Sequence, residues 1–432
     1  MTQFSWHENV ALTRRTLSRR GFLYGASAAA TVGAFNFRDV MSLRAEELRK
    51  QGRAMILLFM QGGPSQLETF DPKPGTDNSG PTTAISTSVS GIQIAEGWEQ
   101  TAKQMQNIAI IRSMTTKEGE HQRAAYQMHT GYIPSGSVKH PSLGACLAKE
   151  LAPLERELPA VVTIGDRGSN GGGAGFLGVD YEPFQVTGRS IGNVPDNVSP
   201  TVGDHRFTRR LSLLDKLEGE FAARGGETVV NNHRRIYDKS AKLVLSPLTK
   251  TFDLSQESAE TKERYGDTEF GKGCLLARRL IESGVTFVEV RLNGWDTHQD
   301  VFDGVKGLAG KCDPALAALI ADLKDRGLFD KTLVVWTGEF GRTPKVNPRT
   351  GRDHWPRNFN ALLAGGGIKG GQVIGETAKD GMGILHDPVS IPDLFSTICK
   401  SLEVDPAKEN MSPIGRPLKI VDGGKPVAKL FV

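Results

Sequence analysis

The chain has 432 residues, of which 38% are hydrophobic and 7% aromatic, and its formal net charge is +4. This length allows two or three average domains or one large α/β domain with an ample core. Residues 1–34 alone carry a net charge of +3, so the remainder lacks the basic surface that nucleic-acid binding requires. The four cysteines are widely spaced and give neither a zinc-ribbon spacing nor a disulfide framework.

The first segment reads as an export signal. SRRGFL, at residues 18–23, precedes YGASAAATVGAF, a mildly apolar stretch rich in Ala and Gly. That stretch is too short for a membrane span but suits a signal peptide. Arg19 and Arg20 resemble the twin-arginine motif, although an ordinary basic, amphipathic start is the alternative. We therefore expect export by the twin-arginine machinery to the periplasm or the outside, with cleavage near Ala34.

The rest of the chain shows no internal repeat and no clear linker after residue 53. We predict a signal peptide at 1–34, a linker at 35–53 and one domain at 54–432. We expect no membrane span in the mature chain.

Near-continuous apolar runs, typical of strands buried on both faces, recur along this domain. They are RAMILLFM (53–60), NIAIIRSM (107–114), AVVTIG (160–165), VTFVEVRL (285–292), TLVVWTGEF (332–340) and FNALLAGGG (359–367). Segments with helical periodicity lie between them, at 121–132, 140–152, 210–225, 269–284 and 313–327. This alternation predicts a three-layer α/β/α sandwich with a mostly parallel central sheet. The glycine- and proline-rich stretch from about 166 to 205 is expected to be an insertion loop.

Polar clusters directly follow several of these runs, where ligands bind in parallel sheets. GWDTHQD, at residues 294–300, offers Asp296 and His298, which point the same way because they are two residues apart. Two carboxylates and an imidazole packed so closely resist burial unless a positive charge lies among them.

Two further clusters supply more candidate ligands. TGEFGRTP, at 337–344, contains Glu339 and Arg342, and GRDHWP, at 351–356, contains His354. Mixed imidazole and carboxylate ligands suit a zinc, manganese or calcium-type divalent ion. The alternative for each cluster is a capped turn without a ligand.

The loop after the first run, QGGPSQLETFD, contains glycines that can expose backbone N–H groups. We predict that Gln61, Gly62 and Ser65 in this loop contact substrate.

Taken together, these segments resemble one family. YGDTEFGKGCLLARRLIESGVTFVEVRLNGWDTH, TLVVWTGEFGRTPKVN, GRDHWP and LLAGGGIKGGQVIG resemble the DUF1501 family of exported bacterial proteins. That family is similar to the alkaline phosphatase and sulfatase superfamily, which implies a three-layer fold with a metal cluster at the strand ends. The resemblance implies Asp296, His298 and His354 as ligands, with Glu339 beside them.

The motifs also depart from those of active superfamily members. Gln61 stands where an Asp ligand is usual, and Glu339-Phe340 replaces an Asp-His pair. His121 stands where a Ser, Thr or Cys nucleophile is usual. These departures leave the second metal site and the nucleophile open.

The resemblance implies an exported, metal-dependent hydrolase of phosphate or sulfate esters, acting on a small-molecule or glycan ester. Arg342 would neutralise the anionic group through its planar fork. His121, at a predicted helix start, would be a general acid or base, a covalent phosphoryl acceptor or another ligand. The alternative is a non-catalytic member that binds a sulfated or phosphorylated glycan or a partner exoprotein.

Overall fold

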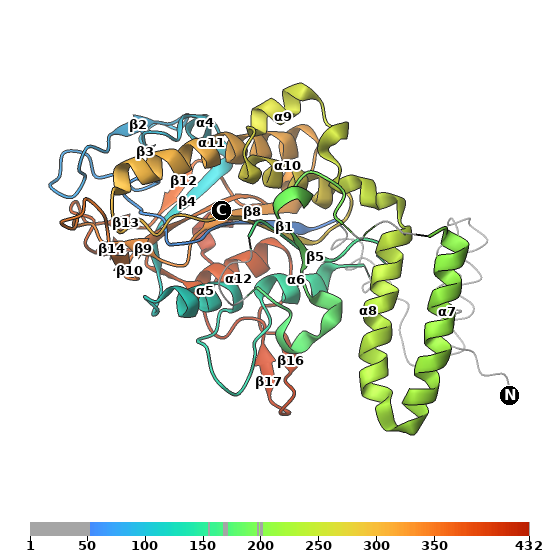
Figure 1. The fold of residues 1–432 in the computed structure, drawn as a ribbon. Helices are drawn as coiled ribbons and strands as arrows, with labels where there is room; N and C mark the ends of the chain where they lie inside the picture. Colours follow the sequence, from blue (N-terminus) through green and yellow to red (C-terminus); the bar gives the residue numbers. More distant parts are fainter. Residues whose placement is uncertain (1–51, 154–155, 167–171, 197, 199–201, 432) are drawn as a thin grey trace, which may run out of the picture. The chain divides into compact units, whose positions relative to one another are not determined.

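The structure is a computed structural model that describes residues 52–431 except 154–155, 167–171, 197 and 199–201. The predicted signal peptide and most of the predicted linker, including Arg19 and Arg20, lie outside the described residues. The fold of the described part is built on a nine-stranded sheet with the order β12-β4-β11-β8-β1-β7-β5-β6, and β15 also pairs with β4 (Figure 1).

The sheet is mostly parallel. Its strands are β1 (Ala54–Met60), β4 (Ile108–Thr115), β5 (Val161–Ile164), β6 (Phe184–Val186), β7 (Phe287–Leu292), β8 (Thr332–Thr337), β11 (Phe359–Gly365), β12 (Gln372–Ile374) and β15 (Val389–Ser390). Only β11 runs against its neighbours, β4 and β8, and every other pair is parallel.

Strand β1 shows why these runs are apolar throughout. Ile56 and Leu58 pack into the core on one face of the sheet, whereas Met55 and Leu57 pack into the core on the other face. Successive side chains of a strand point to opposite faces, so a strand covered on both sides needs apolar residues at every position.

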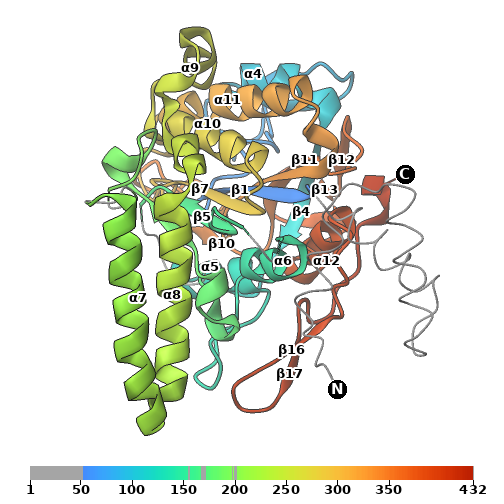
Figure 2. The ribbon, with the colours of Figure 1, turned by 90° about the vertical axis from the view of Figure 1, so that its right-hand side faces the viewer.

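Helices cover both faces of the sheet (Figures 1 and 2). The first layer contains α4 (Glu99–Lys103), α9 (Ala259–Tyr265), α10 (Glu269–Glu282) and α11 (Val301–Asp325). The second layer contains α5 (His121–Thr130), α6 (Leu143–Leu151) and α12 (Ile391–Ser401). The predicted three-layer α/β/α sandwich with a mostly parallel sheet is confirmed.

Some elements differ from the predicted ones. Helix α11 begins at Val301 rather than at 313, and Pro314 lies inside it. The stretch expected to be an insertion loop contains β6, which extends the sheet beside β5. Two long helices, α7 (Asp204–Phe221) and α8 (Glu227–Leu245), follow this stretch and form a hairpin.

Short antiparallel pairs complete the described part. They are β2 (Ala84–Ser86) with β3 (Gln93–Ala95), β9 (Gly341–Arg342) with β10 (His354–Trp355), β13 (Glu376–Thr377) with β14 (Ile384–His386) and β16 (Glu409–Met411) with β17 (Pro417–Lys419). Among the described residues, we find no helix with the length and apolar character needed to cross a bilayer.

Candidate metal centre

The chain segments that follow four parallel strands meet at one edge of the sheet. Gly62 follows β1, Asp296 follows β7 and Glu339 follows β8. Helix α5 begins with His121 shortly after β4 ends. Binding sites of parallel α/β sheets lie at this carboxyl edge.

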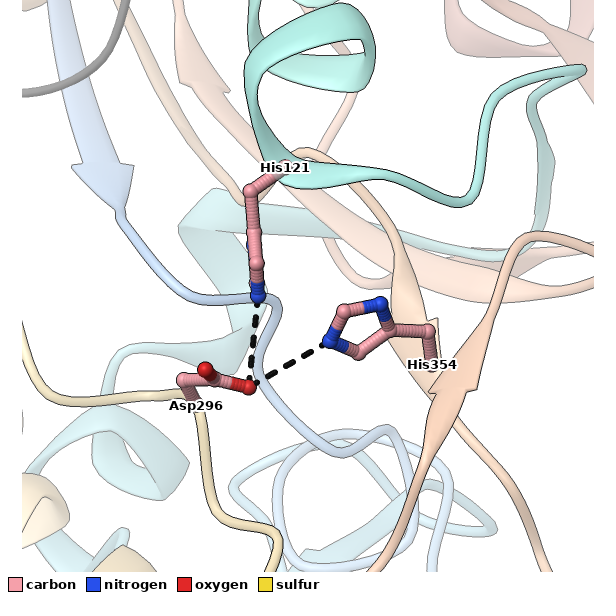
Figure 3. Close-up of side chains that lie close together, drawn as sticks. All are labelled: His121, Asp296 and His354. Carbon is pink, nitrogen blue, oxygen red and sulfur yellow. Dashed lines mark ion pairs between the residues drawn. The ribbon is translucent and has the colours of Figure 1, made fainter.

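Three imidazoles converge on one carboxylate oxygen. The Oδ1 atom of Asp296 lies 3.3 Å from Nε2 of His121, 3.1 Å from Nε2 of His298 and 3.4 Å from Nε2 of His354. Figure 3 shows His121 reaching Asp296 from the start of α5 and His354 reaching it from β10. The Nε2 atoms of His298 and His354 are 3.0 Å apart.

The other nitrogen of each ring, Nδ1, lies within hydrogen-bond distance of an oxygen acceptor. The pairs are His121 with Glu339 (2.8 Å), His298 with Asp353 (2.9 Å) and His354 with the carbonyl of Gly119 (2.8 Å). A ring that donates its Nδ1 proton outward and is neutral presents an unprotonated Nε2, which is the form that binds a metal. All three rings are therefore held in the orientation of metal ligands.

This arrangement fits a bound cation. Two unprotonated Nε2 atoms only 3.0 Å apart repel each other unless a proton or a cation lies among them. In addition, Nε2 of His121 is buried and has no hydrogen-bond partner. The ligand atoms of His121, Asp296 and His354 all lie within 4.8 Å of one another, so the three residues form a possible metal-binding group.

The charges around the centre shift its pKa values. Burial acts to raise the pKa of Asp296, but the hydrogen bond and charge of Arg342, with His121 and His298 nearby, lower it to about 2. Burial acts to lower the pKa of His121, but Glu339 and Asp296 outweigh it and raise that pKa. Burial lowers the pKa of His354, and the hydrogen bond to the Gly119 carbonyl opposes this only in part.

Arg342 lies behind the centre rather than in front of it. Its side chain is fully buried, and its Nη2 atom lies 2.5 Å from Oδ1 of Asp296. Its Nε, Nη1 and Nη2 atoms also donate to the backbone carbonyls of Gly63, Arg352 and Gly62, respectively. The side chain therefore faces Asp296 and the backbone, and the role of anion clamp stays a prediction.

Glu339 also lies behind the imidazole of His121, on the side away from the Oδ1 atom of Asp296. It is fully buried, and its Oε1 atom accepts from the amide of Gly62 at 2.9 Å and faces Nδ1 of His121. Its Oε2 atom has no hydrogen-bond partner. The sequence predicted Glu339 as a ligand; in this geometry its Oε1 atom faces Nδ1 of His121, and its role as a ligand stays a prediction.

The predicted substrate contacts are largely turned inward. The amide of Gly62 is engaged with Glu339, and the hydroxyl of Ser65 is buried without a hydrogen-bond partner. Gln61 is half-buried, and its Oε1 atom also has no partner. Neither the amide of Gly62 nor the hydroxyl of Ser65 is presented as a free surface donor.

An aromatic ring fills the space beside the imidazoles. The ring of Phe340 is buried, with its centroid 4.9 Å from that of His121 and 4.7 Å from that of His354. Gly63 has a φ of +77°, and a Cβ added there would lie 2.6 Å from this ring. The glycine therefore lets the first loop pass close to Phe340.

The loops that carry the ligands are locked together by backbone contacts. The amide of Arg352 donates to the carbonyl of Thr297 at 3.0 Å. A Cβ added at Gly351 would lie 2.0 Å from the carbonyl group of His298. Arg352 itself is fully buried and forms a two-pronged ion pair with Glu68, at 3.0 and 2.6 Å.

Sequence reasoning missed some of these contacts. The sequence placed Asp353 with His354 in the candidate cluster GRDHWP, but it did not predict that Asp353 would face His298. The Gly119 carbonyl carried no signal, because any residue offers a backbone carbonyl. The ion pair of Glu68 and Arg352 joins positions far apart in sequence, so it too was hidden.

A comparison with protein-family models matches residues 52–431 to the family described as "Protein of unknown function (DUF1501)". The chain belongs to the DUF1501 family. Among curated proteins, no sequence matches this DUF1501 chain.

Several solved structures are similar to parts of this chain. A phosphonate monoester hydrolase of Agrobacterium radiobacter is 12% identical, with a TM-score of 0.41, over 88% of this chain and 77% of the hydrolase. The PsFucS1 sulfatase from Pseudoalteromonas sp. is 13% identical, with a TM-score of 0.39, over 84% and 70%. An alkaline phosphatase superfamily protein from Vibrio parahaemolyticus is 13% identical, with a TM-score of 0.39, over 82% and 67%.

Proposed function

We propose that this protein is a metal-dependent hydrolase of phosphate or sulfate esters, acting on a small-molecule or glycan ester. One observation carries the proposal. Three imidazoles, each with Nδ1 facing an acceptor, turn their Nε2 atoms toward one carboxylate oxygen of Asp296.

The residues that would hold the ion are His121, His298, His354 and Asp296. Three nitrogen ligands and one carboxylate favour zinc, and manganese next, over calcium, which takes oxygen ligands. Bound there, such an ion would polarise an ester oxygen and lower the pKa of a water molecule.

The surrounding residues have distinct supporting roles. Arg342 holds Asp296 ionised and in position, as its 2.5 Å contact and the lowered pKa of Asp296 indicate. Glu339 accepts the Nδ1 proton of His121 and so keeps Nε2 directed at the centre. We therefore favour His121 as a ligand over a separate acid, base or phosphoryl acceptor.

The test begins with metal analysis of the purified full chain. We expect about one equivalent of zinc or manganese, loss of turnover on chelation, and recovery with zinc but not with calcium. The substrates would be aryl phosphates, aryl sulfates and phosphonate monoesters. Absence of a stoichiometric metal, or equal turnover after His298→Ala, would overturn the proposal.

His121→Ala separates the roles left open for that residue. Loss of bound metal together with turnover identifies a ligand. Retained metal with a loss of at least about a hundredfold in turnover identifies an acid–base group. Retained metal with unchanged turnover removes His121 from the mechanism.

A second candidate is a non-catalytic protein that binds a sulfated or phosphorylated glycan, or a partner exoprotein. The buried ring of Phe340 favours this candidate. It lies beside the rings of His121 and His354, and an apolar side chain there cannot serve as a metal ligand. Metal-loaded protein that binds a sulfated glycan but turns over none of the esters would select this candidate.

We further propose that the chain is exported by the twin-arginine pathway to the periplasm or the outside. SRRGFL, with Arg19 and Arg20, supports this part of the proposal.

A further inference from the structure

The hairpin of α7 and α8 carries large apolar side chains that the rest of the described chain does not cover. Leu213, Leu217 and Phe221 on α7, with Val229 and Ile236 on α8, are between 44% and 67% exposed. Figures 1 and 2 show α7 on the outer side of α8, away from the sheet. Contiguous exposed apolar groups of this kind mark interaction surfaces.

These side chains share one face of the hairpin. The α7 residues are spaced by four, and the α8 residues by seven, so each set forms a stripe along its helix. At 3.6 residues per turn, each stripe lies roughly a third of a turn from the contact residues Asp215 and Glu218 on α7 or His233 and Arg234 on α8. Because the two helices run in opposite directions, both stripes fall on the same side. We call these five residues the hairpin face.

The midpoints of the α7 stripe and the α8 stripe lie at the same height along the hairpin. Glu218 lies 2.5 Å from Nδ1 of His233, and an ion pair joins Asp215 to Arg234; these contacts fix how the two helices align. Leu217, the middle of the α7 stripe, therefore lies level with residues 232–233, the midpoint of the α8 stripe.

We propose that the hairpin face is the interface of a homodimer, in which two antiparallel hairpins form a four-helix bundle. A twofold axis through the common centre would place Leu217 against Leu217 of the partner subunit. It would also place Leu213 against Phe221 of the partner subunit. A twofold interface needs a patch that is complementary to itself, and this apolar pattern meets that condition.

The area of the face agrees with such a dimer. Helices of 18 and 19 residues are about 27 Å long and roughly 10 Å wide each, so the face covers on the order of 540 Å². Two copies would bury about 1,100 Å², at the lower end of specific interfaces. The dimer should therefore dissociate on dilution.

The first test is sedimentation velocity of the full chain over a range of concentrations. We expect a monomer–dimer equilibrium that Leu217→Glu shifts to monomer. Leu385→Glu, on β14, is the matched control because Leu385 is 62% exposed and lies outside the hairpin. Unchanged circular dichroism would show that both variants are folded. A wild-type chain that stays monomeric, or a dimer that survives Leu217→Glu, would overturn the proposal.

The second test is disulfide capture at the proposed axis. The four native cysteines are all buried, so an introduced thiol is the reactive one. Packed helices 8–10 Å apart bring side chains on the axis within disulfide reach. Under mild oxidation, Leu217→Cys should form a covalent dimer well before Leu385→Cys does. Equal rates for the two variants would mean random collision, or that residues 1–51 or another protein cover the face, and would refute the homodimer.

Discussion

The imidazoles of the candidate centre are held from behind by three different acceptors. Glu339 is fully buried, Asp353 is about half exposed, and the third acceptor is a backbone carbonyl. An acceptor at Nδ1 fixes both the tautomer and the orientation of a ligand histidine. Among these acceptors, only Asp353 can be removed without opening a buried space, which makes it the cleanest probe of the arrangement.

Asp353→Ala should weaken zinc binding while leaving the fold intact. His298 would lose the carboxylate at its Nδ1, and loss of such a partner typically lowers metal affinity about 10- to 100-fold. The affinity can be measured by competition with a chromophoric chelator. Asp353→Asn should recover part of the loss, because its amide oxygen still accepts a hydrogen bond. Asp303→Ala, at an exposed position of α11, is the control. Zinc affinity unchanged in Asp353→Ala would mean that His298 is not a ligand.

For single residues, the sequence predicts which polar side chains lie together at the candidate centre, but it predicts their individual roles less well. Asp296 and His298 follow an apolar run that ends at this edge of the sheet, and the family resemblance implied these two residues and His354 as ligands. Their side chains do meet there. Arg342 and Glu339 follow another such run, yet both side chains turn inward, and nothing in TGEFGRTP shows that direction in advance.

At the scale of elements, helix α5 connects the centre to the middle of the sheet. His121 begins the helix, and Glu120 caps it by accepting from two backbone amides. Near the other end, His129 faces Glu289 of β7 at 3.1 Å, and Arg291 donates to the same carboxylate at 2.6 Å. A displacement of this buried ionic group would move the helix that positions His121.

Glu289→Gln should remove an acid-sensitive part of the stability. Burial acts to raise the pKa of Glu289, but the charges of His129 and Arg291 lower it from 4.5 to about 2. A lowered folded-state pKa means that this stability is present above about pH 4.5 and is lost as the pH falls toward 2. The loss amounts to roughly 3 kcal/mol in the free energy of unfolding.

Urea denaturation at several pH values measures this effect. The variant should be less stable near neutral pH, because His129 and Arg291 lose their partner, and its stability should fall less steeply below pH 4.5. Glu260→Gln, at an exposed position of α9, is the control. Parallel stability curves for Glu289→Gln and wild type would show that this ionic group contributes no pH dependence.

The boundaries of elements were predicted less well than their existence. The first half of α11 contains Gly304, Gly307 and Gly310, which lower helix propensity, so only the part after Asp313 was predicted. Packing against α4, α9 and α10 overrides that propensity. Strand β6 has only three residues, too few for a periodic signal.

At the scale of the whole molecule, the sequence predicts the architecture well. Apolar runs alternating with helical segments are enough for a sheet covered on both faces, and the six predicted runs correspond to β1, β4, β5, β7, β8 and β11. The order of the strands was not predictable, because strand order depends on packing between distant segments. The centre depends on that order, since β1 lies between β7 and β8 and brings their loops together.

Because the centre joins loops from several strands, metal binding should stabilise the whole domain. An ion that binds only the folded state adds about 2.7 kcal/mol when its free concentration is 100 times the Kd. Zinc should therefore raise the Tm of wild-type protein, and a chelator should reverse the rise. Asp296→Ala combined with His298→Ala should abolish this response, as differential scanning fluorimetry can measure. If zinc raises the Tm of the double variant equally, the ion binds elsewhere.

The leader lies outside the described residues, and its amino-acid sequence alone indicates its role. The interpretation as a twin-arginine signal depends on the adjacent guanidinium groups of Arg19 and Arg20. Lysine keeps the positive charge but lacks the planar guanidinium group. Replacing both with lysine should leave the protein in the cytoplasm with the Tm and metal content of wild type. Fractionation of cells that express each form would show this. The matched control replaces Arg14 and Arg15 with lysine, which makes the same two substitutions outside SRRGFL. This control should be exported normally. Export of the Arg19/Arg20 variant at the wild-type level would mean that the segment is an ordinary basic start.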